Sequence, residues 1–331
     1  MRAFIKDIAY VLPKKIVTND DLICEFPEWN AEKITEKIGV NKRHIVTSET
    51  ATDMAVEAAE KLFAHGLVEK NEVDFILFCT QSPDYKLPTS ACIIQDRLGL
   101  PKELGALDFD LGCSGYEYGL ALSKGLILAG IAQNILLLTG DTYSKYIHPK
   151  DKGNRTIFGD AASATIISNN GFAEIGEFVL GTDGKGKDNL IIKTGAAKIP
   201  EKKGDLSFDT KGTPSSSDYL FMNGAEIFTF TLSVVPKMIN DVLKMNGLNK
   251  SEISLFIFHQ ANKYLLNHLR KKLKINEDLF YMNLFDIGNT VSSTIPIALC
   301  DAYKEGKVLG NVLLAGFGVG YSWGSTILKI H

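Results

Sequence analysis

The sequence predicts an α/β protein made of two similar halves. Two observations predict the class: short apolar runs that are continuous instead of alternating, and amphipathic helix patterns between these runs. Continuous apolar strands are typical of sheets that helices cover on both faces. A third observation predicts the two halves, because three segments recur in the same order later in the chain.

The first recurring segment spans residues 66–78 (GLVEKNEVDFILF), which residues 247–258 (GLNKSEISLFIF) repeat with one deletion. Each copy is typical of a helix end, a polar turn and a buried strand. Apolar residues at helical spacing precede both copies, in residues 54–62 and in residues 234–243. The glycine that opens each copy is expected to end its helix in a left-handed conformation.

Two further pairs of segments keep nearly the same offset. Residues 134–138 (NILLL) correspond to residues 311–315 (NVLLA), an offset of 311 − 134 = 177. Residues 109–113 (FDLGC) correspond to residues 285–289 (FDIGN), an offset of 289 − 113 = 176. Three pairs in one order are hard to obtain by chance, so we expect two copies of one half-fold that share a core.

The repeat divides the chain of 331 residues at its middle. We predict an N-terminal half in residues 1–170 and a C-terminal half in residues 171–331. Within the second half, residues 171–220 are rich in Gly, Ser, Thr and Lys and are predicted to be connecting loops and short hairpins.

Composition excludes several classes of protein. The chain has 36 Lys and Arg against 39 Asp and Glu, and a net charge of −3 provides no global field for nucleic acid or anionic lipid. Its apolar runs fall far short of the roughly 18 residues that a membrane-spanning helix needs. Asp7 and Pro13 interrupt the beginning of the chain before an apolar signal stretch could form, so we expect a cytoplasmic protein.

One of the cysteines is a candidate nucleophile. They are odd in number and scattered, without a C-x-x-C pair or clustered histidines, which disfavours a disulfide framework and a structural zinc site. Cys113 is the candidate, because it follows a strand-like stretch and precedes a predicted helix start at residues 114–122. The helix dipole is expected to lower the pKa of this thiol, and the small Gly112 and Gly115 would let a substrate approach it.

Two other polar residues follow predicted strands or repeat segments. His259 ends the strand-like residues 255–258, at a carboxyl edge where α/β sites gather. Asn289 is the repeat-mate of Cys113 and precedes a Thr- and Ser-rich segment. Alone, His259 could be a core histidine and Asn289 a helix cap.

Together these motifs resemble a known family. Asp-Leu-Gly-Cys113-Ser-Gly, Phe-His259-Gln-Ala-Asn and Gly-Asn289-Thr-Val-Ser-Ser, in this order, are similar to the Cys-His-Asn triad of the β-ketoacyl-acyl-carrier-protein synthase III family. Further short matches extend the resemblance over nearly the whole chain; they lie at residues 17–22, 39–44, 157–162 and 318–325. The resemblance implies a thiolase-like fold in which two pseudo-symmetric βα halves form a five-layered αβαβα core.

The resemblance also implies an acyltransferase that performs a decarboxylating Claisen condensation. Cys113 would take an acyl group from acyl-CoA, with the N–H groups of Cys113 and Val319 as oxyanion donors. His259 and Asn289 would donate N–H groups to the enolate left when malonyl-acyl-carrier protein loses CO₂. Asparagine cannot shuttle protons, which suits carbanion formation by loss of CO₂. No cofactor is implied, since coenzyme A and phosphopantetheine thioesters are the substrates.

The expected coenzyme A contacts depart from the family pattern. Lys37 and Lys152 stand where the family has arginines, and Lys33 stands where it often has a tryptophan that stacks on adenine. Lysine keeps the charge but loses the stacking and the bidentate fork. Trp29 would replace the aromatic ring only if its loop is shifted by four residues. Acyl-CoA is expected as the donor, and an acyl-carrier-protein donor stays open.

Other contacts are carried over from the family. Asn262 would hydrogen-bond the pantetheine, and Leu87 aligns with a residue that crosses a homodimer interface to close the partner's acyl pocket. The carrier is acidic, and four basic residues after His259 are predicted near one helix face, where they would form a carrier-protein patch: Lys263, Arg270, Lys271 and Lys274. A solvated helix face is the simpler interpretation. No nucleic-acid or membrane partner is expected.

Glu117 lies one helical turn after Cys113. A charge so close would raise the pKa of the thiol, so we expect this carboxylate to turn away toward a polar neighbour. If it faces the site, it would orient a non-malonyl acceptor. Two other functions stay open: acyl transfer from Cys113 to a hydroxyl or amine of a sugar or secondary metabolite without decarboxylation, and a non-enzymatic scaffold of thiolase fold.

Overall fold

The structure is a computed structural model that describes residues 2–210 and 212–331, so residues 1 and 211 of the two predicted halves lie outside it. Within this part of the chain, ten strands form one mixed sheet in the order β14-β13-β15-β16-β8-β1-β7-β6-β4-β5. Five come from the N-terminal half: β1 (Phe4–Val11), β4 (Phe75–Cys79), β5 (Gly105–Phe109), β6 (Asn134–Asp141) and β7 (Ala161–Ser168). Five come from the C-terminal half: β8 (Ala173–Thr182), β13 (Ile253–Phe258), β14 (Phe280–Tyr281), β15 (Asn311–Gly318) and β16 (Ser322–Ile330).

The two sets of strands have the same internal order. Read outward from the junction, one set runs β1-β7-β6-β4-β5 and the other runs β8-β16-β15-β13-β14. The sets join only where β1 pairs with β8, through Phe4 with Glu174 and Ile5 with Ala173. The repeated sequence segments give equivalent strands, β4 with β13 and β6 with β15, and Gly66 and Gly247 both have the predicted positive φ, +71° and +66°.

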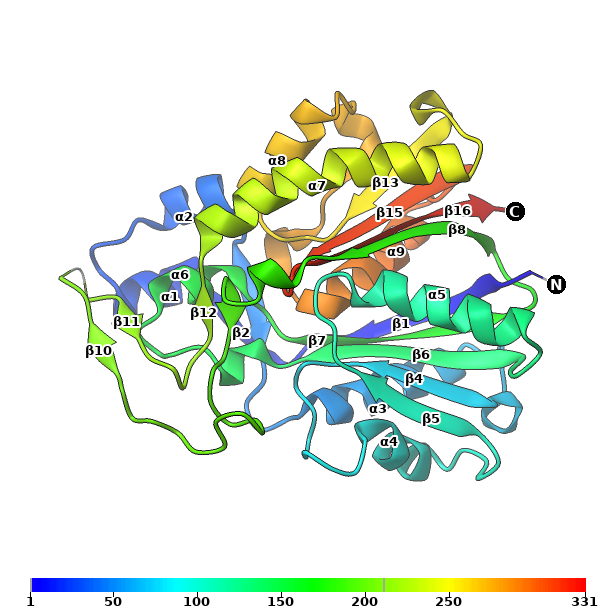
Figure 1. Cartoon of the computed structure of the whole chain (residues 1–331), viewed down its shortest axis with the longest axis horizontal. Helices are drawn as coiled ribbons and strands as arrows, with labels where there is room; N and C mark the ends of the chain where they lie inside the picture. Colours follow the sequence, from blue (N-terminus) through cyan, green and yellow to red (C-terminus); the bar gives the residue numbers. More distant parts are fainter. Residues whose placement is uncertain (1, 211) are drawn as a thin grey trace.

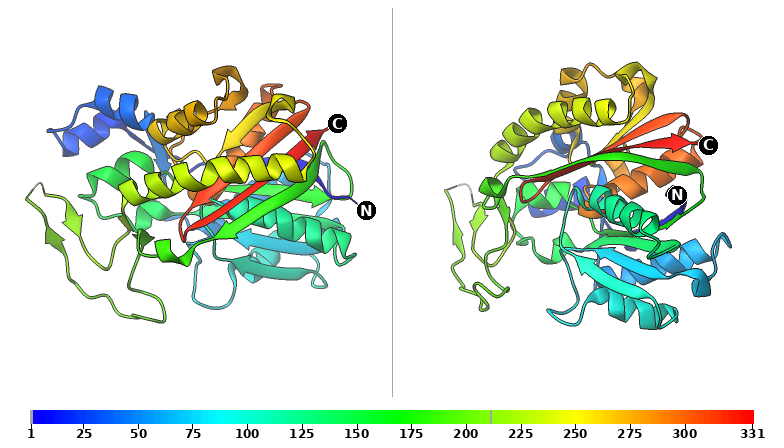
Figure 2. Two further views of the ribbon diagram at one scale, coloured as in Figure 1. Left: turned by 45° about the horizontal axis from the view of Figure 1, so that its top comes forward. Right: turned by 45° about the vertical axis from the view of Figure 1, so that its right-hand side comes forward.

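Helices separate and cover the two sets of strands in five layers (Figures 1 and 2). The outer layers hold α3 (Ala51–Phe63) and α4 (Ser90–Leu98) on one side, and α7 (Gly224–Met245) and α8 (Lys263–Lys272) on the other. The middle layer holds α5 (Gly115–Leu128) and α9 (Thr294–Lys304), which contact strands of both halves. Parallel neighbours such as β4, β5 and β6 are therefore covered on both faces, as their apolar sequences require. The predicted α/β class and αβαβα layering are confirmed.

One strand lies where the sequence predicts loops. Strand β8 pairs with β16 from Ala173 to Thr182, inside the segment 171–220. The loop prediction is wrong for β8 because its residues are only partly buried and lack a continuous apolar run. The following residues do form short pairs, of β9 (Leu190–Ile191) with β12 (Phe221–Met222) and of β10 (Ser207–Phe208) with β11 (Pro214–Ser215).

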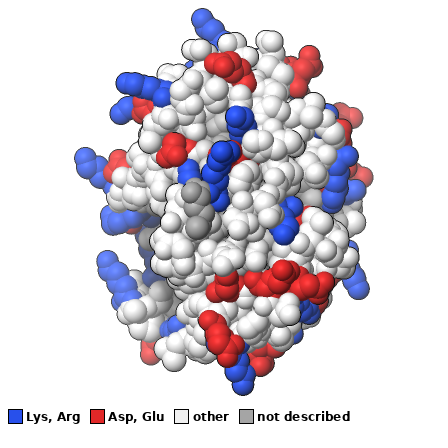
Figure 3. Space-filling view, turned by 90° about the vertical axis from the view of Figure 1, so that its right-hand side faces the viewer, with Lys and Arg blue, Asp and Glu red and all other residues white. Residues whose placement is uncertain are grey.

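The remaining elements gather at one end of the molecule, beside these hairpins (Figure 1). They are β2 (Lys15–Thr18), α1 (Asn19–Glu25), α2 (Ala31–Ile38), β3 (Lys42–Ile45) and α6 (Lys152–Ile157). The other end carries both termini and has no continuous basic surface, because acidic side chains gather across its lower part and basic ones are scattered above (Figure 3). In residues 2–210 and 212–331, every helix is too short or too polar to cross a membrane.

Candidate active site

Cys113 lies in the turn between β5 and α5, buried where the two halves meet. The turn is tight, because the N–H of Gly115 donates to the carbonyl of Gly112 at 2.8 Å. Strand β15 of the other half passes directly over the thiol at Gly318. A β-carbon placed on Gly318 would lie 2.7 Å from Cys113 Sγ, so only glycine allows this approach.

The thiol of Cys113 does not have the lowered pKa that the helix start predicts. Burial raises the pKa of Cys113 to about 12, and the backbone N–H groups of Val319 and Cys113 only partly oppose this by donating to the sulfur. Nearby Asp141 raises the pKa further. The prediction is wrong because desolvation of the thiolate outweighs these donors. The resting thiol is therefore protonated, and its two N–H neighbours are the groups predicted as oxyanion donors.

His259 directly follows β13 and faces the start of α9. Its Nδ1 lies 2.7 Å from Thr294 Oγ1, and its backbone N–H donates to the carbonyl of Ala315 on β15. The ring packs edge-on against Phe317, with 5.9 Å between ring centroids. Burial lowers the pKa of His259 to about 3, so the imidazole is neutral at physiological pH.

Asn289 lies in the loop before α9, pinned against the N-terminal half. Its backbone N–H donates to Ile157 and its carbonyl accepts from Gly159. The side-chain Oδ1 accepts from the N–H of Val291 at 2.9 Å, which turns Nδ2 toward His259 Nε2 at 3.5 Å. The amide is thus fixed as a donor toward the imidazole.

Thr294 sets which nitrogen of His259 carries the proton, and sequence reasoning missed it. The Thr294 hydroxyl lies 3.1 Å from the carbonyl of Val291 as well as 2.7 Å from Nδ1. When it donates to Val291, Nδ1 keeps the proton and Nε2 is an acceptor. When it donates to Nδ1, Nε2–H becomes a donor. The sequence held no signal for this role, because a threonine at a helix start is ordinary.

The three predicted catalytic residues line one cavity of about 420 Å³. Its other walls are mainly apolar or aromatic; they include Phe158, Leu190, Met222, Phe228, Leu265 and Phe317. An apolar cavity with a few convergent polar groups is typical of a small-molecule site. Cys113 comes from the N-terminal half, whereas His259 and Asn289 come from the C-terminal half, so this site exists only where the halves pack together.

Known proteins share this architecture and sequence. The family model of 3-oxoacyl-[acyl-carrier-protein] synthase III matches residues 107–184, and the model of its C-terminal part matches residues 243–330. A β-ketoacyl-[acyl-carrier-protein] synthase III from Clostridium perfringens is 35% identical over 321 residues, 96% of each chain. The chain belongs to the synthase III family.

Solved structures of synthase III enzymes agree with this assignment. One 3-oxoacyl-(acyl-carrier-protein) synthase III is 49% identical, with a TM-score of 0.97 and full coverage of both chains. A 3-oxoacyl-(acyl-carrier protein) synthase from Burkholderia xenovorans is 37% identical, with a TM-score of 0.92, over all of this chain and 94% of that one. The chain is therefore an enzyme of the synthase III type with a thiolase-like fold.

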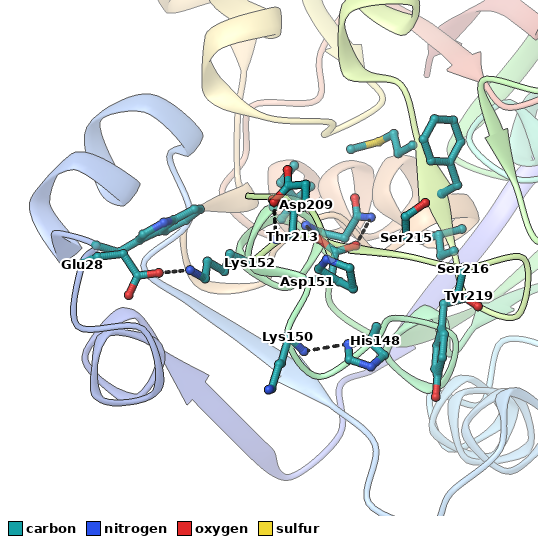
Figure 4. A pocket seen from close by; sticks show the side chains of 18 residues that line it. Glu28, His148, Lys150, Asp151, Lys152, Asp209, Thr213, Ser215, Ser216 and Tyr219 are labelled. Atoms are coloured by element: carbon teal, nitrogen blue, oxygen red, sulfur yellow. Dashed lines mark hydrogen bonds and ion pairs between the residues drawn. The ribbon is translucent and has the colours of Figure 1, made fainter. Parts of the chain in front are cut away.

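Of the predicted coenzyme A residues of this synthase III, Lys152 lies at a second cavity of about 730 Å³, whereas Lys37 is not among the residues that line this cavity. Lys152 opens α6 and lines this cavity together with Trp29, and its ammonium is paired with Glu28 (Figure 4). The same ammonium lies 5.4 Å from the centroid of the Phe26 ring. Lys37 is exposed in the last turn of α2. Trp29 thus shares a cavity with Lys152, which the shifted-loop interpretation requires.

Leu87 lies at the surface, whereas Asn262 lines the active-site cavity. Leu87 is 82% exposed in the loop between β4 and α4, away from the cavity of its own chain. Asn262 lines the active-site cavity and caps α8, since its Oδ1 accepts from the N–H of Leu265 at 2.9 Å. The Nδ2 group of Asn262 is the part of this side chain that remains for a pantetheine carbonyl.

The four basic residues predicted as a carrier-protein patch do not share one helix face. Lys263 opens α8, with its alkyl chain against Gly39. Arg270 has a side chain only 15% exposed and pairs with Glu277 at 3.0 Å. Lys271 is exposed, and so is Lys274, which lies beyond the end of α8 with φ of +52°. The common face is not formed because α8 ends at Lys272 and Arg270 folds back onto its own turn.

Glu117 also differs from expectation. Its side chain is fully buried, and neither carboxyl oxygen has a hydrogen-bond partner among the described residues, so the predicted turn toward a polar neighbour is wrong. Glycines of β15 and β16 make the room: a β-carbon on Gly324 would lie 2.8 Å from Glu117 Cβ. Burial raises the pKa of Glu117 well above its usual range, which favours the neutral carboxyl, and the proximity of this acid is one of the smaller causes that raise the pKa of Cys113.

Proposed function

We propose that this synthase III condenses an acyl-CoA primer with malonyl-acyl-carrier protein, with loss of CO₂, in fatty-acid or specialised acyl-chain biosynthesis. The observation that carries the proposal is one cavity shared by a buried thiol, a neutral imidazole and a carboxamide, from Cys113, His259 and Asn289. The names of the relatives, each a synthase III for acyl chains on acyl-carrier protein, support it.

The first half-reaction loads Cys113. The Sγ–C bond forms as the thioester C–S bond breaks, and the thiol proton leaves with coenzyme A. The N–H groups of Val319 and Cys113 already donate toward the sulfur and are placed for the oxyanion that forms beside it. Because the resting thiol is protonated and His259 is too weak a base to hold its proton, we assign the proton to the departing coenzyme A sulfur, which takes it up as the thioester C–S bond breaks.

The second half-reaction uses the form of the imidazole in which Nε2 carries the proton. When malonyl thioester loses CO₂, negative charge develops on the enolate oxygen, and Nε2–H of His259 and Nδ2–H of Asn289 would donate to it. A pKa of about 3 keeps His259 from becoming a cation that holds the enolate too tightly. The enolate carbon then attacks the acyl carbon on Cys113, and the thiolate leaves.

The same proposal includes two protein partners. Strand β5 ends the sheet, so one of its edges is unpaired within the described chain and suits pairing with a second copy in a homodimer. In that homodimer the exposed Leu87 would reach the partner's acyl site. Acyl-carrier protein would bind at the exposed Lys271 and Lys274, in and just beyond the last turn of α8, the helix that Asn262 caps at its other end. Neither half-reaction as written requires a cofactor.

A second candidate is acyl transfer from Cys113 to a hydroxyl or amine without decarboxylation. The observation that favours it is the larger cavity, which shares Ile157 and Met222 with the active-site cavity. Its lining is richer in polar groups; they include His148, Asn154, Ser215, Ser216 and Tyr219 (Figure 4). A sugar-like acceptor in this cavity would be separated from the cavity of the acyl-cysteine by the shared residues Ile157 and Met222.

Intact mass of the carrier protein distinguishes the two candidates. The enzyme is incubated with acetyl-CoA and malonyl-acyl-carrier protein, and the carrier is weighed. We expect the malonyl carrier to be replaced by a β-ketoacyl carrier, and Cys113→Ala to abolish the change. A malonyl carrier that stays intact while Cys113 becomes acylated would overturn the proposed condensation and favour the second candidate.

A further inference from the structure

Two polar side chains, Gln81 and Tyr143, lie against the residues that flank Cys113. A β-carbon placed on Gly112 would lie 2.6 Å from Gln81 Oε1, so this carboxamide sits beside the nucleophile turn. Tyr143 belongs to the same buried cluster as Cys113, and its hydroxyl donates to Gln81 Oε1 at 2.6 Å. Gln81 Nε2 in turn donates to Asp110 at 2.8 Å. The two half-reactions described above use neither residue.

The neighbours of this pair on the Tyr143 side and above Gly112 are apolar and closely packed. The Tyr143 ring packs on Phe158 with 5.3 Å between centroids, and Leu190 belongs to the same cluster. Methyl groups of Val319 and Val291 reach 2.8 Å and 3.3 Å from the point above Gly112 that Gln81 also approaches. The groups around Gly112 are therefore crowded on this side of Cys113, which leaves room for a short chain only, and the Gln81–Tyr143 hydrogen bond is a polar contact among them.

The pair is held rigidly and can still accept hydrogen bonds. Burial raises the pKa of Tyr143 well above its usual range, so the phenol keeps its proton and donates it to Gln81. A carboxamide oxygen has two lone pairs and a phenol oxygen accepts as well as donates, so both oxygens can receive a ligand hydroxyl. A plain alkyl chain would cover the Tyr143 oxygen without any hydrogen bond, which is unfavourable because Tyr143 is buried.

We propose that the acyl group carried by Cys113 is short and bears a hydroxyl, which donates to the oxygens of Gln81 and Tyr143. The inference rests on the proposed function, because it concerns the primer loaded in the first half-reaction. The loading chemistry is unchanged: the thioester bond to coenzyme A breaks, the Sγ–C bond forms, and the hydroxyl takes no part. Sites built to bind a substrate hydroxyl reject the analogue that lacks it.

Acylation of Cys113 by two matched thioesters tests the inference. 3-Hydroxybutyryl-CoA and butyryl-CoA have the same carbon count and differ in one hydroxyl. The full-length enzyme is mixed with each, without malonyl carrier, and the Cys113 adduct is followed by intact mass under single-turnover conditions. We expect the hydroxylated thioester to react faster by about tenfold or more, the effect of one buried hydrogen bond.

Variants test whether Gln81 and Tyr143 cause the difference between the two acylation rates. Tyr143→Phe and Gln81→Leu each remove a polar group at nearly constant shape, and we expect both to bring the ratio of the two rate constants close to 1. Tyr146→Phe is the matched control, because Tyr146 packs on Tyr143 with 6.4 Å between centroids but bonds to Ser82 instead of Gln81. It should keep the wild-type ratio.

The outcomes separate this inference from the proposed function. Equal rates for both thioesters in the wild type, or a ratio that survives Tyr143→Phe and Gln81→Leu, would overturn the inference and leave the proposed function standing, since Cys113 is still acylated from coenzyme A. If neither thioester nor acetyl-CoA forms an adduct on Cys113, the proposed function fails together with the inference.

Discussion

At the scale of single residues, burial keeps the reactive groups of the resting site neutral. Desolvation raises the pKa values of Cys113 and Glu117 and lowers that of His259, so thiol, carboxyl and imidazole are all uncharged. A neutral site suits the proposed chemistry, in which charge develops only on the substrate and is met by fixed N–H donors.

Replacing Thr294 by Val should slow condensation, because the hydroxyl that orients His259 Nδ1 at 2.7 Å is lost. We expect kcat to fall by about tenfold to a hundredfold, as one hydrogen bond of about 1.5–3 kcal/mol implies, with little change in KM for the carrier substrate. Thr294→Ser keeps the hydroxyl and should restore most of kcat. Steady-state kinetics of the three proteins give the comparison, and equal losses in both variants would contradict the assigned role.

Glu117→Gln should stabilise the protein at neutral and alkaline pH. Because the folded-state pKa of Glu117 is raised, the folded state binds more protons than the unfolded state above about pH 4.5, and wild-type stability falls as pH rises toward the folded pKa. This group contributes a loss of about 1.4 kcal/mol per pH unit in that window.

Urea unfolding of wild type and Glu117→Gln at pH 5 and pH 8 measures this effect. The variant should lose less free energy of unfolding between the two pH values than the wild type does. An identical pH dependence of the two proteins would show that Glu117 is not the buried acid described here.

At the scale of elements, strand β15 approaches Cys113 so closely that the contact depends on glycine. Gly318→Ala would place a methyl group 2.7 Å from Sγ, so we expect acylation of Cys113 to slow by about a hundredfold or more. Gly125→Ala in α5 is the matched control, because nothing lies within 4 Å of the added carbon. That change should leave acylation unaltered and add about 0.5–1 kcal/mol of stability. Acylation of Gly318→Ala at the wild-type rate would contradict the described contact.

The last turn of helix α8 and the segment that follows it present the exposed lysines of the proposed carrier surface, Lys271 and Lys274. The double change Lys271→Glu and Lys274→Glu should raise KM for malonyl-acyl-carrier protein several-fold at low salt and leave KM for malonyl-CoA unaltered, because only the protein substrate covers this surface. Lys307→Glu, near the C-terminal end of α9, is the control. Equal effects on both malonyl substrates would place the carrier elsewhere.

At the scale of the whole molecule, the internal sequence repeat explains how much of the fold the sequence predicts. Residues 66–78 and 247–258 are alike because β4 and β13 occupy equivalent buried positions in the two halves. Strand β8 escaped prediction because it joins the sheet at the junction and is only partly buried, so no apolar run marks it. Periodicity detects a strand by a continuous apolar run or by strict alternation, and residues 173–182 show neither.

The active site, like the fold, was predictable only in part from the sequence. Cys113, His259 and Asn289 were predictable because their three motifs follow one another in the order found in the synthase III family. In the structure the three residues line one cavity. Thr294, Gln81 and Tyr143 could not be found, because their roles depend on contacts between segments far apart in sequence. The raised pKa of Cys113 likewise depends on how completely the two halves enclose the thiol.

Release of CO₂ from malonyl-acyl-carrier protein labelled in its free carboxyl group tests the central claim most directly. With an acyl-CoA primer that acylates Cys113, we expect labelled CO₂ and β-ketoacyl carrier to appear in equal amounts, and Asn289→Asp to suppress both, since a carboxylate cannot donate to the enolate. Acylated Cys113 without release of labelled CO₂ from any malonyl carrier would contradict the account.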